Sequence, residues 1–180
     1  PETEHLVGGA LDELDRLGPP YETVEGPVEE VRGAVVVDLG TGSGAIGLSI
    51  AGERSGVVVH ATDVSADALD VAASNLAWLG GRAATRVRLH AGSWWVALPA
   101  ELSGRVDLVV SNPPYIATPE MAGLDAGVRD WEPRRALEAG IRGVEAIETI
   151  VSGAPVWLRP GGTAVLEIAP HQAGEAVALA

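Results

Sequence analysis

The sequence lacks cysteine and lysine, and its apolar runs are no longer than a buried strand. Without cysteine, the chain has no disulfide and no thiolate ligand for a metal, which fits a cytoplasmic protein. We find neither a secretory signal nor a segment with the length of a membrane span, so we expect a cytoplasmic protein without a membrane partner. All twelve basic residues are arginine, which we interpret as a compositional bias of the source genome.

Positive charge is scarce, and the net charge is −13 at pH 7. A protein that grips a nucleic-acid backbone normally presents a basic stripe. The group formed by Arg82, Arg86 and Arg88 is interpreted as a solvated face around a strand. An acidic surface suits a neutral small molecule, a cationic ligand or a basic protein. We therefore expect no direct binding of nucleic acid.

Most of the chain alternates short apolar segments with segments of helical periodicity. Its 180 residues, 47% hydrophobic content and mean hydropathy of +0.20 indicate one globular domain. Apolar strands that alternate with helices are typical of a parallel sheet. We predict an α/β fold with a doubly wound, mostly parallel sheet and helices on both faces. The expected strands are 34–38, 57–62, 86–90, 106–110 and 163–168, and the expected helices are 2–17, 44–51, 65–79, 143–158 and one that begins near His171.

Two stretches are less regular. Residues 1–33 are expected to form an N-terminal helix, with Thr3 as its N-cap, and a linker that leads into a domain of residues 34–180. Residues 116–140 form a long irregular stretch, and such stretches in compact domains are usually functional. Because this stretch contains Met121, Arg129 and Trp131, we predict a lid that faces the substrate.

A glycine-rich loop, D-L-G-T-G-S-G at 38–44, follows the first predicted strand. Its glycines allow a sharp turn and a close approach of a ligand to the backbone, and the next helix offers free N–H groups. We predict that the loop binds a ligand and that Asp38 holds it by accepting N–H groups. Two alternatives stay open, namely a turn needed only for packing and the dinucleotide pattern G-x-G-x-x-G at 42–47.

Asp63 ends the second predicted strand, 23 positions after Gly40. This is close to the spacing of a carboxylate that binds ribose hydroxyls. The alternative is that Asp63 caps the helix that follows. Ser65 can serve as that cap and leave Asp63 free, so we favour the binding of ribose.

The third predicted strand ends at A-G-S-W-W. Either tryptophan can present a flat apolar wall to an adenine ring, while Ser93 and backbone groups read the edge of the ring. The alternative is that both tryptophans belong to the core. We expect Trp94 near the ligand and Trp95 buried.

The fourth predicted strand ends in a rigid loop, within V-D-L-V-V-S-N-P-P-Y at 106–115. Pro113 and Pro114 donate no N–H and hold φ near about −65°, which fixes Asn112 and Tyr115 at the edge of the sheet where ligands bind. The Asn112 oxygen and a free carbonyl can accept both hydrogens of a planar –NH2 group, with Tyr115 flat against it. We predict a clamp for an amide or an aromatic amine, and a simple turn is the alternative.

These motifs at the ends of four strands resemble the class I methyltransferases that use S-adenosylmethionine, and among them the PrmC/HemK family of release factor glutamine methyltransferases. The resemblance covers nearly the whole chain. It extends to P-E-T-E at 1–4, V-R-D-W-E-P-R-R-A-L-E-A-G at 128–140 and L-R-P-G-G-T-A-V-L-E-I at 158–168. The P-E-T-E and E-P-x-x-A-L-x-x-G segments distinguish this family from amino-methyltransferases of DNA or RNA.

The resemblance implies a methyl transfer from S-adenosylmethionine to the side-chain amide nitrogen of the glutamine in the Gly-Gly-Gln motif of a release factor. It places this activity in residues 34–180, with a release factor as partner and without a metal. Asn112 and Tyr115 are the implied catalytic residues. The implied donor contacts are Gly40, Thr41, Gly42, Ser43, Gly44, Asp63, Ser93, Trp94 and Asn112, and the implied substrate contacts are Asn112, Pro113, Pro114 and Tyr115.

Three features depart from the family pattern. The family's helical N-terminal domain is missing, the final antiparallel strand pair of a seven-stranded sheet is missing, and Ser93 replaces an Asp often found beside the tryptophan. We interpret the chain as truncated, which would spare donor binding more than affinity for a release factor. Two alternatives remain: an adenine amino-methyltransferase of DNA or RNA, since N-P-P-Y also suits a flipped adenine, and a nucleotide-binding domain without turnover.

Overall fold

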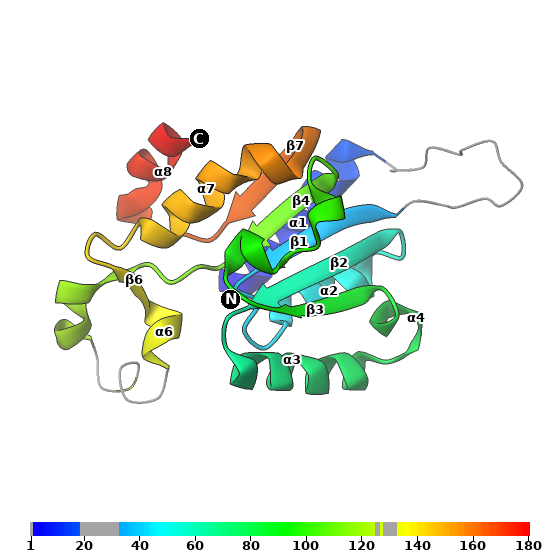
Figure 1. The fold of residues 1–180 in the computed structure, drawn as a ribbon, viewed down its shortest axis with the longest axis horizontal. Helices are drawn as coiled ribbons and strands as arrows, with labels where there is room; N and C mark the ends of the chain where they lie inside the picture. The colour runs from blue at the N-terminus through cyan, green and yellow to red at the C-terminus, as the bar shows by residue number, and fades with distance from the viewer. Residues whose placement is uncertain (1, 19–32, 125–126, 128–132) are drawn as a thin grey trace, which may run out of the picture.

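The computed structural model describes residues 2–18, 33–124, 127 and 133–180. Its main sheet has the strand order β3-β2-β1-β4-β7, and every pairing in it is parallel (Figure 1). The predicted α/β fold with a mostly parallel sheet is confirmed. The strands are β1 (Ala34–Leu39), β2 (Val57–Asp63), β3 (Val87–Ala91), β4 (Val106–Ser111) and β7 (Leu158–Leu166).

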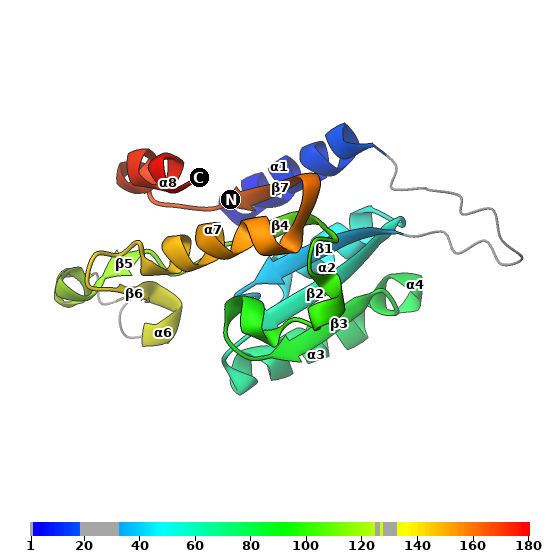
Figure 2. The ribbon, with the colours of Figure 1, turned by 45° about the horizontal axis from the view of Figure 1, so that its top comes forward.

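Helices cover both faces of this sheet (Figures 1 and 2). One face packs against α1 (Glu2–Leu17), α2 (Ala45–Glu53) and α3 (Ala66–Leu79), and the other against α7 (Glu145–Trp157) and the 3-10 helices η1 (Trp94–Ala97) and η2 (Ala100–Leu102). The remaining elements are α4 (Gly81–Ala84), β5 (Ile116–Ala117), η3 (Thr118–Gly123), α6 (Arg134–Leu137), β6 (Glu138–Gly140), η4 (Pro170–Gln172) and α8 (Ala173–Leu179). In the described part of the chain, no helix has the length and apolar character needed to cross a membrane.

The central strands explain the continuous apolar runs of the sequence. Successive side chains of a strand point to opposite faces, and in β1 Val36 packs into the cluster with α1 and α2 whereas Val37 packs into the cluster with α7. All residues of β1 and β4 are buried. Both faces of these strands are therefore core, which is why they show no polar alternation.

The strand order determines where a ligand can bind. The chain leaves β1 for β2 on one side, and β4 lies on the other side of β1. In doubly wound sheets, the crevice at the carboxyl ends of strands beside such a reversal is the usual ligand site. The loops after β1, β2, β3 and β4 all begin at this edge of the sheet.

The described residues of the stretch 116–140, which are 116–124, 127 and 133–140, contain more regular structure than the predicted irregular stretch. β5 and β6 pair in a second, two-stranded sheet. Glu138 in β6 accepts hydrogen bonds from Thr118 Oγ1 at 2.7 Å and Arg134 Nε at 2.6 Å. The prediction failed because the pairing joins two very short strands that lie far apart in sequence. Of the residues assigned to a lid, Met121 is buried, and Arg129 and Trp131 lie outside the described residues.

The predicted N-terminal helix is confirmed, but its predicted N-cap is wrong. α1 already includes Glu2, so Thr3 lies within the first turn. Leu6, Ala10 and Leu14 are buried in the core cluster of the sheet. Most of the predicted linker, residues 19–32, lies outside the described residues.

Candidate functional site

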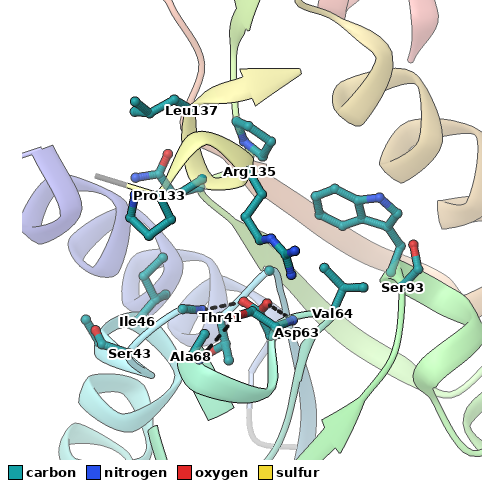
Figure 3. Close-up of a pocket in the computed structure, with 18 of the residues that line it drawn as sticks. Thr41, Ser43, Ile46, Asp63, Val64, Ala68, Ser93, Pro133, Arg135 and Leu137 are labelled. Atoms are coloured by element: carbon teal, nitrogen blue, oxygen red, sulfur yellow. Dashed lines mark hydrogen bonds between the residues drawn. The ribbon is translucent and has the colours of Figure 1, made fainter. Parts of the chain in front are cut away.

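A cavity of about 500 Å³ opens at the carboxyl edge of the sheet (Figure 3). It is lined by the loops after the first four strands, by α1 and by the segment around α6. The predicted site residues found in its wall are Gly40, Thr41, Gly42, Ser43, Asp63, Ser93, Trp94, Asn112, Pro114 and Tyr115. Gly44, which is the N-cap of α2, and Pro113 are outside the lining, and both residues are buried.

The glycine loop packs tightly against the aromatic wall. Gly40 has a φ of +70°, and a Cβ there would lie 3.3 Å from the ring of Trp94. Glycine is therefore required both for the backbone conformation and for the close approach of the indole. Trp95 is 7% exposed and its Nε1 donates to the Thr149 carbonyl at 3.0 Å. The expected burial of Trp95 is confirmed. Trp94 lines the cavity, and its place beside a ligand stays a prediction.

Asp38 holds the glycine loop to the helix that follows it. Its Oδ2 accepts hydrogen bonds from Thr41 Oγ1 at 2.6 Å and from the Gly47 N–H at 2.9 Å. Its Oδ1 is buried without a hydrogen-bond partner among the described residues. Burial raises the pKa of the Asp38 carboxyl to about 6, although the two hydrogen bonds favour the charged form. The predicted structural role of Asp38 is confirmed.

Asp63 joins the ends of β1 and β2. Its Oδ2 accepts the Gly42 N–H at 2.9 Å, and its Oδ1 accepts the Ser65 N–H at 2.8 Å. Ser65 caps α3, as predicted, by accepting the Ala68 N–H at 3.4 Å. The expectation that Asp63 would be left free is wrong, because each oxygen already holds a backbone donor. A carboxylate oxygen can accept more than one hydrogen bond, so binding of ribose stays a prediction.

The predicted clamp lies on the same cavity. Asn112, Pro114 and Tyr115 contribute to its wall. Upstream, Ser111 Oγ donates to the Leu39 carbonyl at 2.6 Å and so ties the end of β4 to the end of β1. Within the described part of the chain, the Asn112 side chain makes no hydrogen bond. Its amide group is therefore available to a ligand.

The part of the cavity wall formed by the segment around α6 was not predicted from the sequence. Figure 3 shows Arg135 reaching from α6 toward Asp63 and the glycine loop. The E-P-R-R-A-L segment carried a family resemblance, but no periodicity or spacing indicated that it returns to the sheet edge. The lining residues that were not predicted to bind a ligand are Thr3, Ala45, Ile46, Val64, Ser65, Ala68, Gly92, Pro133, Arg135, Ala136 and Leu137.

The arginine group has a partly different role from the one expected. Arg82 and Arg88 are exposed, in agreement with a solvated face. Arg86, by contrast, donates to the carbonyls of Ala51 at 2.8 Å, Arg54 at 2.7 Å and Val57 at 3.0 Å. It thereby satisfies the carbonyls of Ala51 and Arg54 at the C-terminal end of α2, where intrahelical donors are lacking, and ties them to Val57 at the start of β2. Among the described residues, no three His, Asp or Glu side chains are grouped so that they could hold a metal ion.

Comparison with known proteins agrees with this geometry. The sequence model of the family described as "Methyltransferase small domain" matches residues 26–124. The chain belongs to this family.

Curated relatives are much closer in sequence than the solved structures. A release factor glutamine methyltransferase from Cereibacter sphaeroides is 48% identical over 178 residues, which are 99% of this chain and 55% of that protein. One from Gloeobacter violaceus is 44% identical over 99% of this chain and 56% of that protein. The predicted resemblance to these enzymes is confirmed, and the chain spans just over half of their length.

The similarity to solved structures concerns the fold. A predicted O-methyltransferase from Agrobacterium tumefaciens has a TM-score of 0.55 and 20% identity, and the match covers 81% of this chain and 59% of that one. This agrees with the expected methyltransferase architecture.

Proposed function

We propose that the chain is the catalytic part of a release factor glutamine methyltransferase. It would transfer a methyl group from S-adenosylmethionine to the side-chain amide nitrogen of the glutamine in the Gly-Gly-Gln motif of a release factor. Residues 34–180 would form the catalytic domain, after an N-terminal helix and a linker. One observation carries this proposal: Asn112 and Tyr115 share a single cavity with the glycine loop and Asp63. The choice of substrate is supported by the two relatives at 48% and 44% identity, both of which are named release factor glutamine methyltransferases.

The residues of the cavity fit the methyl donor. A volume of about 500 Å³ is within the usual range for a small-molecule site. The exposed backbone of the glycine loop would take the methionine part of the donor, Asp63 the ribose, and Ser93 and Trp94 the adenine. Trp94 also lies against Gly40, so the proposed adenine wall and the glycine loop are neighbours in the cavity.

The clamp addresses the chemical difficulty of the reaction. An amide nitrogen is a poor nucleophile because its lone pair is delocalised into the carbonyl, and the bound donor supplies an electrophilic methyl group on sulfur. The Asn112 oxygen and the Pro113 carbonyl would accept both N–H hydrogens of the substrate amide and aim the nitrogen lone pair. Positioning and fixed dipoles of this kind can lower a barrier by several kcal/mol. Tyr115 would lie against the amide plane, and the surplus proton would leave afterwards without a dedicated base.

The charge of the chain favours a protein substrate over a nucleic acid. The net charge is −13, and Arg86 is committed to backbone carbonyls. Binding to a phosphate backbone depends on available cations. The same acidic surface suits a basic protein.

Mass spectrometry tests the proposal directly. A purified release factor is incubated with the chain and S-adenosylmethionine, and its Gly-Gly-Gln peptide is analysed. We expect one added methyl on the glutamine and none in a release factor with Gly-Gly-Ala in place of this motif. Methylation of adenine in a DNA or RNA oligonucleotide, with an unmodified release factor, would overturn the proposal. Donor binding without transfer to either substrate would also reject it for this chain.

A further inference from the structure

Gln172 is a buried polar side chain that contacts the clamp from outside the cavity. It is 3% exposed and lies in η4, just before α8. Its Nε2 donates to the Tyr115 carbonyl at 3.0 Å and to the Gly143 carbonyl at 2.8 Å, while its Oε1 accepts the Ala169 N–H at 3.2 Å. A side-chain amide has two donor hydrogens, and both are used on carbonyls of two different loops.

The two loops are in close contact where Gln172 inserts. Gly143 has a φ of +82°, and a Cβ there would lie 3.0 Å from the Tyr115 oxygen and 3.3 Å from Gln172 Nε2. A side chain at Gly143 would therefore be strained in its backbone and would push these atoms apart. Buried carbonyl oxygens need a donor, since an unpaired one costs free energy. The Gln172 amide supplies that donor to both carbonyls.

Gln172 completes a set of contacts that fix the clamp at both ends. The start of the clamp is tied to the sheet, because Ser111 Oγ donates to the Leu39 carbonyl at 2.6 Å and the Ser111 carbonyl accepts the Glu167 N–H at 3.0 Å. The two prolines restrict φ in the middle of the clamp. Tyr115 is the last residue of the clamp, and its carbonyl is held by Gln172.

We infer that Gln172 is a positioning residue for methyl transfer, because it fixes the main chain of Tyr115 and so the geometry of the amide clamp. The effect of Gln172 on methyl transfer rests on the proposed function. The effect of Gln172 on the conformation of Tyr115 is independent of the proposed function and is measurable in the absence of turnover.

Two variants and one control test this role. Gln172→Glu keeps the size and the acceptor for Ala169 but places an oxygen against two carbonyls. Gln172→Met removes all three hydrogen bonds at similar length. Ile150→Val is the control, since Ile150 is a fully buried residue of α7 that packs in the apolar core cluster of the sheet.

Fluorine NMR gives a direct view of the clamp. The chain has two tyrosines, Tyr21 and Tyr115, so 3-fluorotyrosine labelling gives two resonances, and Tyr115→Phe identifies which one belongs to the clamp. The same proteins are assayed for kcat with a release factor and for the Kd of S-adenosylmethionine.

We expect both Gln172 variants to shift or broaden the Tyr115 resonance, to lower kcat by about 10- to 100-fold and to leave the donor Kd within about twofold. Ile150→Val should change none of the three. An unchanged Tyr115 resonance in folded Gln172 variants overturns the inference, whether or not kcat falls. Loss of folding in both variants also overturns it, because Gln172 would then be a residue of general stability. Absence of transfer by the unsubstituted chain would reject the proposed function, and the resonance would still decide on Gln172.

Discussion

The main-chain N–H of Gly42 donates a 2.9 Å hydrogen bond to Oδ2 of Asp63 and so joins the glycine loop after β1 to the end of β2. The other oxygen of Asp63 accepts the Ser65 N–H. The carboxylate therefore shapes the loop and also faces the cavity. A substitution at this position removes a support of the loop together with the proposed contact to the donor ribose.

Asp63→Ala is expected to weaken binding of S-adenosylmethionine by about 10- to 100-fold, because hydrogen bonds to a charged group contribute about 1.5–3 kcal/mol. Isothermal titration calorimetry measures this Kd. Asp67→Ala is the matched control, since Asp67 is an acidic residue in the first turn of α3 that does not line the cavity. Equal effects of the two substitutions would show that general charge, not the contact of Asp63, controls donor affinity.

Asn112→Ala is expected to abolish turnover and to leave the donor Kd within about twofold, because the side chain makes no hydrogen bond with the described residues and would act chiefly on the substrate amide, with a minor share in the contacts of the donor. Single-turnover methylation of a release factor and calorimetry separate these two effects. Loss of donor binding in this variant would refute the clamp.

Asn75→Ala is expected to affect donor binding and not turnover, which is the reverse of Asn112→Ala. Asn75 Nδ2 donates to the Ser43 carbonyl at 2.9 Å, beneath the glycine loop. Its removal should weaken donor binding by a few-fold, as expected for one net hydrogen bond of about 1 kcal/mol, and should leave kcat at saturating donor unchanged. A fall in kcat of the size caused by Asn112→Ala would contradict the division of roles between loop and clamp.

The parts of the site that were predictable from the sequence lie directly after strands. A strand in a parallel sheet ends at a known edge, so the residues that follow it, such as Asp63 and Asn112, could be placed together from the sequence alone. Arg135 and Gln172 reach the same region through tertiary packing of distant segments, and no local pattern specifies that packing. Asp63 shows a third case, in which the position was right but its two backbone partners depend on distances that spacing does not reveal.

Gly47 is expected to be a packing residue of α2, not part of a dinucleotide site. A Cβ at Gly47 would lie 3.0 Å from Asp38 Oδ2 and 3.0 Å from Val59 Cγ1, so Gly47→Ala crowds these two side chains and requires them or α2 to shift. Overpacking of this kind costs about 1–3 kcal/mol. The higher helix propensity of alanine offsets up to about 1 kcal/mol of that cost.

Gly52→Ala is the same substitution in the same helix with room for a methyl group, since the nearest atom, Leu79 Cδ1, would be 3.7 Å away. It should raise the free energy of unfolding by up to about 1 kcal/mol. Urea unfolding should therefore place Gly47→Ala at least about 1 kcal/mol below Gly52→Ala. Equal stability of the two variants would show that α2 moves without cost, and binding of NADH by the unsubstituted chain would revive the dinucleotide alternative.

Asp38→Asn is expected to gain stability relative to the unsubstituted chain as the pH rises from about 4 to 6. Burial raises the pKa of Asp38 from 3.8 to about 6, so within this window the native state holds a proton that the unfolded state has released. The unsubstituted chain consequently loses stability with rising pH, at up to about 1.4 kcal/mol per pH unit. Asparagine has no such proton and can still accept the hydrogen bonds from Thr41 and Gly47 with its oxygen.

The difference in the free energy of unfolding between the two proteins should therefore increase by up to about 3 kcal/mol between pH 4 and 6 and stay constant above pH 6. Urea titrations at several pH values measure this difference.

Burial and the charge of His90 lower the pKa of His60 to about 4. This gives a slope of opposite sign in the same pH window, but the contribution is common to both proteins and cancels in the difference. Because the amide nitrogen of the introduced asparagine would replace the unpartnered Oδ1, Asp38→Asn also carries a constant cost at every pH. The slope, not the absolute stability, is thus the decisive quantity, and a difference that does not vary with pH would show that Asp38 is already ionised in the native state at pH 4.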